Sequence, residues 1–266
     1  MLGGRVLFAL LLAVAGPARG GESCLLLADP AVDGVLLERG DCDERVTPAS
    51  TFKIALAVMG FEDGFLTDAD HPVLTWQAGE PDWGGPVWRG EVTPRVWMAH
   101  SVVWYSQRIA RALGKARLSA QSRDFGYGNA DFEGDPGRDN GIERAWIGSS
   151  LKISGREQAR LLSRLVTGKL PARPGSMAAA LGLVQTVTVG GWVLHGKTGS
   201  AFGRGPDGSI RRDDATGWFV GWAERDGRMI VFVRLDRSFG AAEGSPGQRA
   251  RAGLLDDWPG LVGGLD

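Results

Sequence analysis

Residues 47–58 read TPASTFKIALAV, and the rest of the chain is best explained around this stretch. Apolar side chains occupy nearly every side of a helix drawn through it, which predicts a helix in the interior of a domain. Thr47 or Pro48 is expected near the helix start, because proline suits the first helical turn. Gly60 is expected to end the helix near Phe61.

Ser50 and Lys53 are the functional polar side chains of this predicted helix. Their spacing places both on one helix face, within hydrogen-bond reach of each other. A serine hydroxyl becomes a nucleophile when a base takes its proton, and a lysine can be that base when burial keeps it neutral. The spacing alone is a weak signal, since Ser149 and Lys152 repeat it.

Five further motifs follow in order along the chain. They are Ser101-Val102-Val103, Tyr127-Gly128-Asn129, residues 146–154 (WIGSSLKIS), Lys197-Thr198-Gly199 and residues 217–222 (GWFVGW). Together with Ser50 and Lys53 they resemble class D, oxacillinase-type, serine β-lactamases, from about Cys24 to the C-terminal helix. The Ser-x-x-Lys and Lys-Thr-Gly elements also occur in related class A enzymes. The resemblance implies hydrolysis of the β-lactam amide bond through an acyl-enzyme on Ser50, and hence antibiotic resistance.

Residues 1–20 have the pattern of a secretory signal peptide. Arg5 precedes an unbroken apolar run from Val6 to Ala15, and Ala18-Arg19-Gly20 is typical of a cleavage site. The apolar run is too short to span a bilayer, so we expect a periplasmic protein without stable membrane insertion. The net charge of −1 gives no basis for binding nucleic acid.

Cys24 and Cys42 flank two apolar runs that are joined through Asp33-Gly34, a favoured hairpin turn. A hairpin that closes there sets the two cysteines opposite each other at its open end. An exported protein would oxidise them to a disulfide, with two free thiols as the alternative.

The 266 residues can bury a sizeable core. We expect one domain at residues 21–266, with a sheet from about residues 21–45 and 182–266 and a helical region at about 61–180. Helical patterns cover residues 92–113, with an interruption around Ser101, and then 119–125, 154–166 and 244–260; strand patterns cover 184–189, 192–196, 217–223 and 229–235. This order predicts an α+β fold, an antiparallel sheet flanked by helices with a mostly helical subdomain. The resemblance implies the same fold, with the active site in the cleft.

The resemblance also assigns chemical roles. Ser50 is the nucleophile, and Lys53 adds carbon dioxide to become a carbamate (N6-carboxylysine), the base for acylation and deacylation. Ser101, hydrogen-bonded to Lys197, passes a proton to the leaving nitrogen. The indole of Trp146 holds the carbamate. Carbon dioxide or bicarbonate is therefore needed, and no other cofactor is implied.

Substrate contacts are expected along the Lys-Thr-Gly strand and its neighbours. The expected binding residues are Val103, Thr198, Gly199, Ser200, Ala201 and Arg249. The backbone N–H groups of Ser50 and Ser200 would stabilise the oxyanion. Arg249 would hold the substrate carboxylate, although Arg251 lies only two residues away. Many relatives carry glycine where Ala201 stands, which puts the substrate range in doubt.

Two other functions share parts of this pattern. One is a non-hydrolytic β-lactam sensor that stays acylated, and such sensors hang from membrane helices that are not seen here. The other is a penicillin-binding carboxypeptidase or transpeptidase, which residues 127–129 and the segment around Trp146 argue against. The sequence leaves open the preferred β-lactams and whether the protein is a monomer or a homodimer. His71, His100 and His195 are scattered, so no metal site is predicted.

Overall fold

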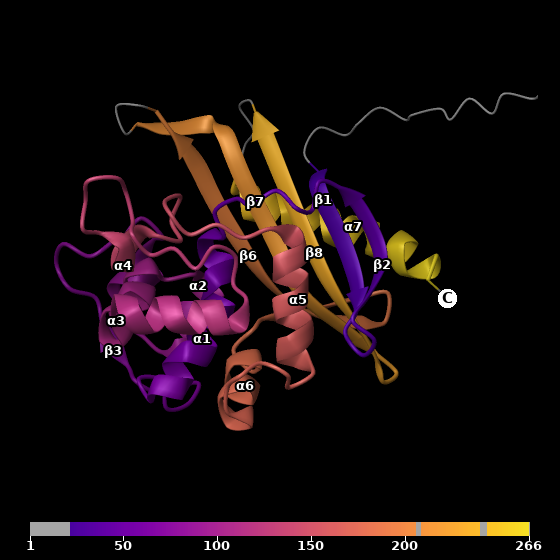
Figure 1. Ribbon diagram of the computed structural model, residues 1–266, viewed down its shortest axis with the longest axis horizontal. Helices are drawn as coiled ribbons and strands as arrows, with labels where there is room; N and C mark the ends of the chain where they lie inside the picture. Colours follow the sequence, from indigo (N-terminus) through magenta and orange to yellow (C-terminus); the bar gives the residue numbers. More distant parts are fainter. Residues whose placement is uncertain (1–21, 206–208, 240–243, 266) are drawn as a thin grey trace, which may run out of the picture.

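One six-stranded antiparallel sheet organises the computed structural model of the chain (Figure 1). The structure describes residues 22–205, 209–239 and 244–265, so the predicted signal peptide lies outside the described residues. The strand order is β2-β1-β8-β7-β6-β5. These strands are β1 (Glu22–Asp29), β2 (Gly34–Gly40), β5 (Thr186–Val189), β6 (Trp192–Arg204), β7 (Ile210–Arg225) and β8 (Arg228–Phe239). The short strands β3 (Leu74–Thr75) and β4 (Glu91–Val92) pair separately.

Most helices lie between β2 and β5 in the chain. The helices are the 3-10 turns η1 (Ala49–Thr51) and η2 (Pro86–Arg89), and α1 (Phe52–Asp63), α2 (Pro94–His100), α3 (Val103–Phe125), α4 (Gly141–Arg144), α5 (Gly155–Val166), α6 (Pro174–Leu181) and α7 (Pro246–Gly263). Among the described residues, no helix combines the length and hydropathy needed to cross a membrane.

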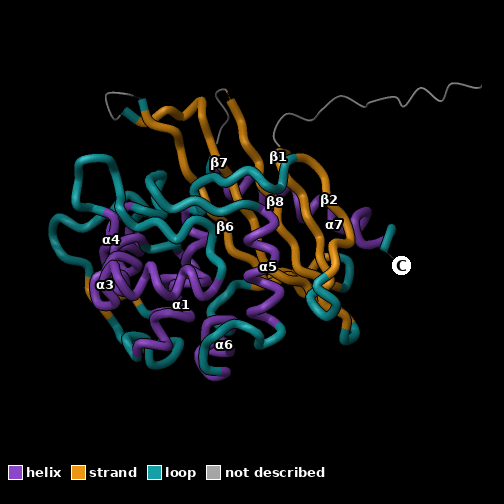
Figure 2. The backbone as a smooth tube through the Cα atoms, viewed as in Figure 1, coloured by secondary structure: helices purple, strands orange, loops and turns teal. Residues whose placement is uncertain are grey.

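The sheet separates two apolar cores. Figure 2 shows α1, α3, α5 and α6 on one side of the strands and α7 behind them. On the α7 side, the ring of Trp258 lies 5.8 Å from Phe232 and 5.9 Å from Trp192, centroid to centroid. Because strand side chains alternate between faces, Leu25 enters the α7 core and Leu26 the core on the other face. The predicted α+β class is confirmed, and the larger core surrounds α1.

The N-terminal hairpin turns earlier than predicted. Asp29 of β1 pairs with Gly34 of β2, and a loop of four residues connects them. The expected two-residue turn at Asp33-Gly34 is therefore wrong, because Asp33 closes a longer loop with φ of 53°. Cys24 consequently lies opposite Gly40 rather than Cys42.

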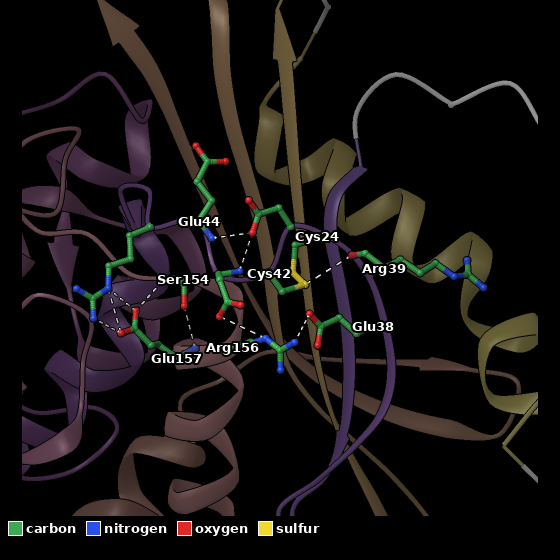
Figure 3. Close-up of polar contacts among 11 residues, drawn as sticks. Cys24, Glu38, Arg39, Cys42, Glu44, Ser154, Arg156 and Glu157 are labelled. Carbon is green, nitrogen blue, oxygen red and sulfur yellow. Dashed lines mark hydrogen bonds and ion pairs between the residues drawn. A yellow bond between two sulfur atoms is a disulfide. The ribbon is translucent and has the colours of Figure 1, made fainter. Parts of the chain in front are cut away.

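The predicted Cys24–Cys42 disulfide is nevertheless present, with the two Cα atoms 4.9 Å apart. Figure 3 shows the bridge beside the start of α5. A Cβ placed on Gly155 would lie 2.5 Å from the Cys24 sulfur, and the Arg156 N–H donates to the Cys42 carbonyl at 3.0 Å. The bridge therefore packs against the first turn of α5.

The central helix begins and ends later than predicted. Pro48 and Ser50 belong to the 3-10 turn η1 or its entry, and the α-helical geometry starts at Phe52. Gly60 does not end the helix, because its lack of a side chain lets Leu66 and Ile109 pack against it. Gly64 ends it instead in the left-handed conformation, with φ of 79°.

The predicted break around Ser101 is confirmed, since this residue has φ of 56° between α2 and α3. Strands β6 and β7 are longer than predicted and extend past the sheet as a hairpin (Figure 1). Residues 210–213 are solvent-exposed in this extension. Because neither face is buried there, the sequence lacks the alternation of apolar and polar residues that marks a strand.

Candidate active site

Ser50 and Lys53 meet at the start of α1. Lys53 Nζ donates a hydrogen bond to Ser50 Oγ over 3.3 Å. Lys53 is only 1% exposed, and its neighbours Phe52 and Ile54 are equally buried. Burial, and secondly repulsion from Lys197, hold the pKa of Lys53 well below its ordinary value of 10.5. The site therefore favours a neutral amine beside a serine hydroxyl, as a general base requires.

A second lysine and serine face this pair. Lys197 Nζ, on β6, donates to Ser101 Oγ at 2.5 Å and to the Thr198 carbonyl at 3.0 Å. Burial lowers the pKa of Lys197 to about 7. The left-handed backbone at Ser101 separates α2 from α3 and leaves this side chain partly exposed. Ser101 can therefore pass a proton between Lys197 and a bound molecule.

Gly199 brings the Lys-Thr-Gly strand against the turn that carries Ser50. A Cβ at Gly199 would lie 2.7 Å from the Pro48 carbonyl oxygen and 3.1 Å from the Thr51 side chain. Any larger residue would push β6 away from η1. The predicted pairing of the Ser50 and Ser200 N–H groups as oxyanion donors requires this close approach and stays a prediction.

The loop with Trp146 is fixed by Thr47, which the sequence reasoning did not assign to the site. Thr47 Oγ1 donates to the Trp146 carbonyl and accepts from the Gly148 N–H, both at 3.0 Å. The Trp146 side chain is buried, with its ring 5.5 Å from that of Phe52. Within the described part of the chain no hydrogen bond is found for the Trp146 indole N–H, so this donor is available to an acceptor in the cavity that Trp146 lines.

A cavity of about 510 Å³ opens over these groups. Six residues predicted for the site line it, namely Ser50, Ser101, Val103, Trp146, Thr198 and Ser200. Lys53, Lys197 and Gly199 lie behind this surface, whereas Ala201 lines a different cavity.

The cavity wall also contains residues that the sequence analysis missed, including Trp83, Trp88 and Gln248. Trp88 is buried, and its indole N–H donates to the His100 carbonyl at 3.0 Å. Trp83 is 67% exposed, with its ring 5.5 Å from Trp88. The clustering of Gly, Pro and Trp at residues 78–94 was the available signal, but it does not say which tryptophan reaches the cavity.

The second Ser-x-x-Lys does not form a pair. Ser149 Oγ donates to Asp135 at 2.7 Å and lines a groove outside the catalytic cavity. Lys152 lines another cavity together with Ala201. Residues 149–152 form an irregular loop. The spacing therefore gives no serine and lysine contact here.

Tyr127-Gly128-Asn129 holds that loop in place. The Asn129 side chain accepts from the Lys152 N–H at 2.9 Å and donates to the Ser150 carbonyl at 2.8 Å. Tyr127 is buried, with its ring edge-on to Phe52 at 5.2 Å. The motif therefore has a structural role in the loop that follows Trp146.

The two candidate arginines of α7 lie in different surroundings. Arg249 donates to the Gly244 carbonyl at 3.0 Å and lines neither cavity at the site. Arg251 lines a cavity of about 270 Å³ that adjoins the catalytic one and shares Thr198 and Gln248 with it. Of the two arginines, Arg251 lines a cavity with Lys197 and Thr198 of the Lys-Thr-Gly strand.

The histidines are dispersed over the fold. His71 contacts Asp68 at 3.1 Å, and the ring of His195 stacks on Trp222 at 4.5 Å between centroids. Within the described residues, no three histidine, cysteine or acidic side chains are grouped closely enough to hold a metal ion.

Comparisons with known proteins agree with this geometry. Residues 28–248 match the family model for the penicillin binding protein transpeptidase domain. The chain is 39% identical to beta-lactamase OXA-9 of Klebsiella pneumoniae, over 90% of this chain and 88% of that protein. It is 33% identical to beta-lactamase OXA-1 of Escherichia coli, over 83% and 78% of the two chains.

A solved structure gives the same result. The crystal structure of the OXA-427 class D beta-lactamase aligns with a TM-score of 0.84 and 40% identity, covering 92% of this chain and all of that chain. The predicted β-lactamase and transpeptidase-like fold is therefore confirmed. The chain belongs to the class D, OXA-type, serine β-lactamases.

Proposed function

We propose that this protein hydrolyses β-lactams through an acyl-enzyme on Ser50, with Lys53, converted to a carbamate, as the general base. Membership of the class D family implies β-lactam hydrolysis. The observation that carries the finer mechanism is the buried Lys53, whose Nζ contacts Ser50 Oγ. A lysine kept neutral by burial can act on the serine proton or react with carbon dioxide.

Acylation uses both serine and lysine pairs. Ser50 Oγ attacks the lactam carbonyl carbon while its proton passes to the base on Lys53. The C–N bond of the lactam breaks, and Ser101 donates its proton to the leaving nitrogen. Lys197 replaces that proton through its 2.5 Å contact with Ser101. The pKa of about 7 makes Lys197 able to give up a proton near neutral pH.

The pocket around Lys53 fits a carbamate. A neutral Nζ adds carbon dioxide and loses one proton, which produces a negatively charged group. A buried anion needs a hydrogen-bond donor, and the indole N–H of Trp146 can supply one. Once it has released the proton taken from Ser50, the carbamate on Lys53 can take a proton from water, so that the water oxygen attacks the ester carbonyl. That proton then passes to Ser50 Oγ as the C–O bond of the ester breaks.

The substrate carboxylate would lie toward the Lys-Thr-Gly strand. Lys197 and Thr198 line the adjoining cavity with Arg251, whose fork of donors suits a carboxylate. Arg249 was predicted for this role from the sequence, and its position outside the cavities supports Arg251 as the alternative. Arg251→Ala should then raise KM for a penicillin about tenfold, while Arg249→Ala changes it little. The reverse result assigns the carboxylate to Arg249.

We further propose that the protein is exported to the periplasm. The signal-like pattern of residues 1–20 and the Cys24–Cys42 disulfide support this, since disulfides persist in oxidising compartments. Mass spectrometry of the exported protein should show that residues 1–20 are absent.

One experiment separates the candidate activities. Purified protein is mixed with a chromogenic cephalosporin or a penicillin, with and without bicarbonate, beside Lys53→Ala. Fast turnover that bicarbonate increases in the parent, and that Lys53→Ala lacks, supports the proposal. A single stoichiometric burst would instead indicate a sensor, and turnover of a peptidoglycan-like peptide without lactam turnover would indicate a carboxypeptidase.

A further inference from the structure

A separate charged cavity lies behind the loop that carries Trp146. It has a volume of about 270 Å³ and lies between the segment before η1, the loop after Trp146 and the ends of β6, β7 and β8. Thr47, Gly148, Lys152, Arg204, Thr216 and Arg237 are among its lining residues. None of these six lines the catalytic cavity.

Lys152 differs from the other lysines of the chain. Lys53 and Lys197 contact serine hydroxyls, Lys115 pairs with Glu133, and Lys169 is exposed. Lys152 is partly buried, and no acceptor for its ammonium group is found among the described residues. A partly buried charge without a partner is unfavourable.

The carboxylates near Lys152 do not compensate the charge of its ammonium group. Arg237 donates to Glu44 at 2.6 Å and lies 3.7 Å from Asp214, so these two carboxylates are held on the guanidinium. Burial, and secondly the positive charge of Arg237, lower the pKa of Lys152. Four cationic side chains line the cavity against two carboxylates, so an anion beside Lys152 would be stabilised. The cations are Arg45, Lys152, Arg204 and Arg237, and the carboxylates are Glu44 and Asp214.

We propose that this cavity binds a small oxyanion of the sulfate or phosphate class, with Lys152 as its principal ligand. Arg237 flanks the anion, and the hydroxyl of Thr216, on the same cavity wall, can donate a hydrogen bond to it. Charged donors that converge from different elements suit a tetrahedral anion with several acceptor oxygens.

An anion here would act on the loop of Trp146. Thr47 and Gly148, which are hydrogen-bonded to each other at 3.0 Å, line this cavity, and Thr47 also binds the Trp146 carbonyl. Lys152 is bound through its backbone to Asn129, at the other end of the same loop. The anion would therefore join both ends of the loop and stabilise the folded protein, since it binds the native state only.

The test is thermal unfolding of the intact protein in sodium sulfate, with sodium chloride at matched ionic strength as the reference. Sulfate is used because its charge does not change near neutral pH. The variants are Lys152→Met, the charge-conserving Lys152→Arg, the exposed control Lys169→Met, and Arg251→Ala at the catalytic cavity. This readout does not depend on hydrolysis, so it can fail independently of the proposed function.

We expect the parent melting temperature to rise saturably in sulfate beyond its value in chloride. Lys152→Met should weaken the apparent sulfate affinity at least tenfold, while Lys152→Arg, Lys169→Met and Arg251→Ala keep it. Circular dichroism checks that each variant is folded. Three outcomes overturn the proposal: no difference between sulfate and chloride, a Lys152→Met response equal to the parent, or loss of the response in Arg251→Ala.

Discussion

The chain contains the same Ser-x-x-Lys spacing twice, with opposite results. Ser50 and Lys53 lie across the junction of η1 and α1, and their side chains touch at 3.3 Å. Ser149 and Lys152 lie in an irregular loop, where they line different cavities. A spacing of three residues brings side chains together only where the backbone is helical.

The two lysines also differ in burial. Lys53 is 1% exposed within the apolar core around α1, while Lys152 is partly exposed at the edge of a polar cavity. Burial is what depresses the pKa of a lysine enough to make it a base near neutral pH. Helical geometry and burial together, not the motif, distinguish the first pair.

Replacing each lysine with alanine is the strongest test of the difference between Lys53 and Lys152. Lys53→Ala should lower kcat/KM by about 10⁴-fold or more, because nucleophile and base act as a unit. Lys152→Ala should change it by less than about threefold, since the Lys152 side chain does not reach the catalytic cavity. Steady-state rates with a penicillin measure both.

Peptide mapping after β-lactam treatment supplies the matching control. One adduct on Ser50 is expected, because Ser149 lies outside the catalytic cavity and contacts no lysine among the described residues. An adduct on Ser149 would contradict the distinction between the two pairs.

Trp146→Ala tests whether the Trp146 indole N–H stabilises the proposed carbamate on Lys53. In the proposed mechanism the carbamate on Lys53 then loses its hydrogen-bond donor, so deacylation should slow by about 10²-fold while acylation continues. High bicarbonate should restore part of the rate, and Lys53→Ala should show no such recovery. Rates against bicarbonate concentration and the mass of the trapped acyl-enzyme provide the measurement. If Trp146→Ala turns over like the parent and ignores bicarbonate, Lys53 works as a plain amine.

The pH dependence of stability should separate buried from exposed lysines. Lys197 has a pKa of about 7 in the folded protein and an ordinary value of 10.5. Between these values the unfolded chain binds more protons, so the free energy of unfolding should increase as pH rises, by about 1.4 kcal/mol per pH unit for one proton. Lys53 acts in the same direction, because its pKa is lowered too.

Urea unfolding between pH 7 and 10, in buffer depleted of carbon dioxide, measures this slope. Lys197→Met should reduce this slope by about 1.4 kcal/mol per pH unit, which is the contribution of one proton. Lys169→Met, at an exposed lysine, should leave the slope unchanged. Equal slopes in all three proteins would mean that the charge on Lys197 is not suppressed by burial.

Reduction of the Cys24–Cys42 disulfide should weaken the packing near Ser149 and Lys152. It should leave the contact between Ser50 and Lys53 unchanged. The bridge packs on Gly155, at the start of the helix that follows Lys152. In the chain-entropy model a loop of this size stabilises by about 3 kcal/mol, so the melting temperature should fall. Turnover at moderate temperature should remain near the parent value, because the bridge lies away from the catalytic cavity. Free thiols at Cys24 and Cys42 in the native protein would contradict the assignment of this disulfide.

Asn129→Ala gives the smallest expected effect. It removes the two hydrogen bonds that hold residues 150 and 152, at a cost of about 1 to 2 kcal/mol in the free energy of unfolding. Asn129→Asp keeps the acceptor for the Lys152 N–H and should lie between the parent and Asn129→Ala. Denaturant unfolding distinguishes the three, and equal stabilities would show that the loop is held by other contacts.

The sequence predicted the parts of the site that depend on local pattern. The apolar neighbours of Lys53 predicted its burial, and the break between α2 and α3 was visible around Ser101. The hydroxyl of Thr47 was missed because its partners, Trp146 and Gly148, lie about a hundred residues away in the chain. Such contacts depend on how elements pack, and no local spacing encodes them.

The same limit applies to the fold boundaries. The hairpin turn was misplaced because an Asp-Gly pair is favourable both in a two-residue turn and at the end of a longer one. The ends of β6 and β7 were missed because their solvent-exposed extension needs no apolar alternation. The two arginines of α7 could not be separated by sequence, since which face of the helix meets the cavity depends on its docking.

The pairing of β1 with β8 has a consequence for how the chain folds. Leu25 and Arg234 are neighbours in the sheet, although nearly the whole chain lies between them. Contacts of such long sequence separation form slowly, because a large loop must close before they contribute. The first strand to be synthesised therefore has no partner in the middle of the sheet until β8, the last of the described strands in chain order, has been made. Until then β1 and β2 form only an isolated hairpin, and the unpaired edges are exposed to aggregation.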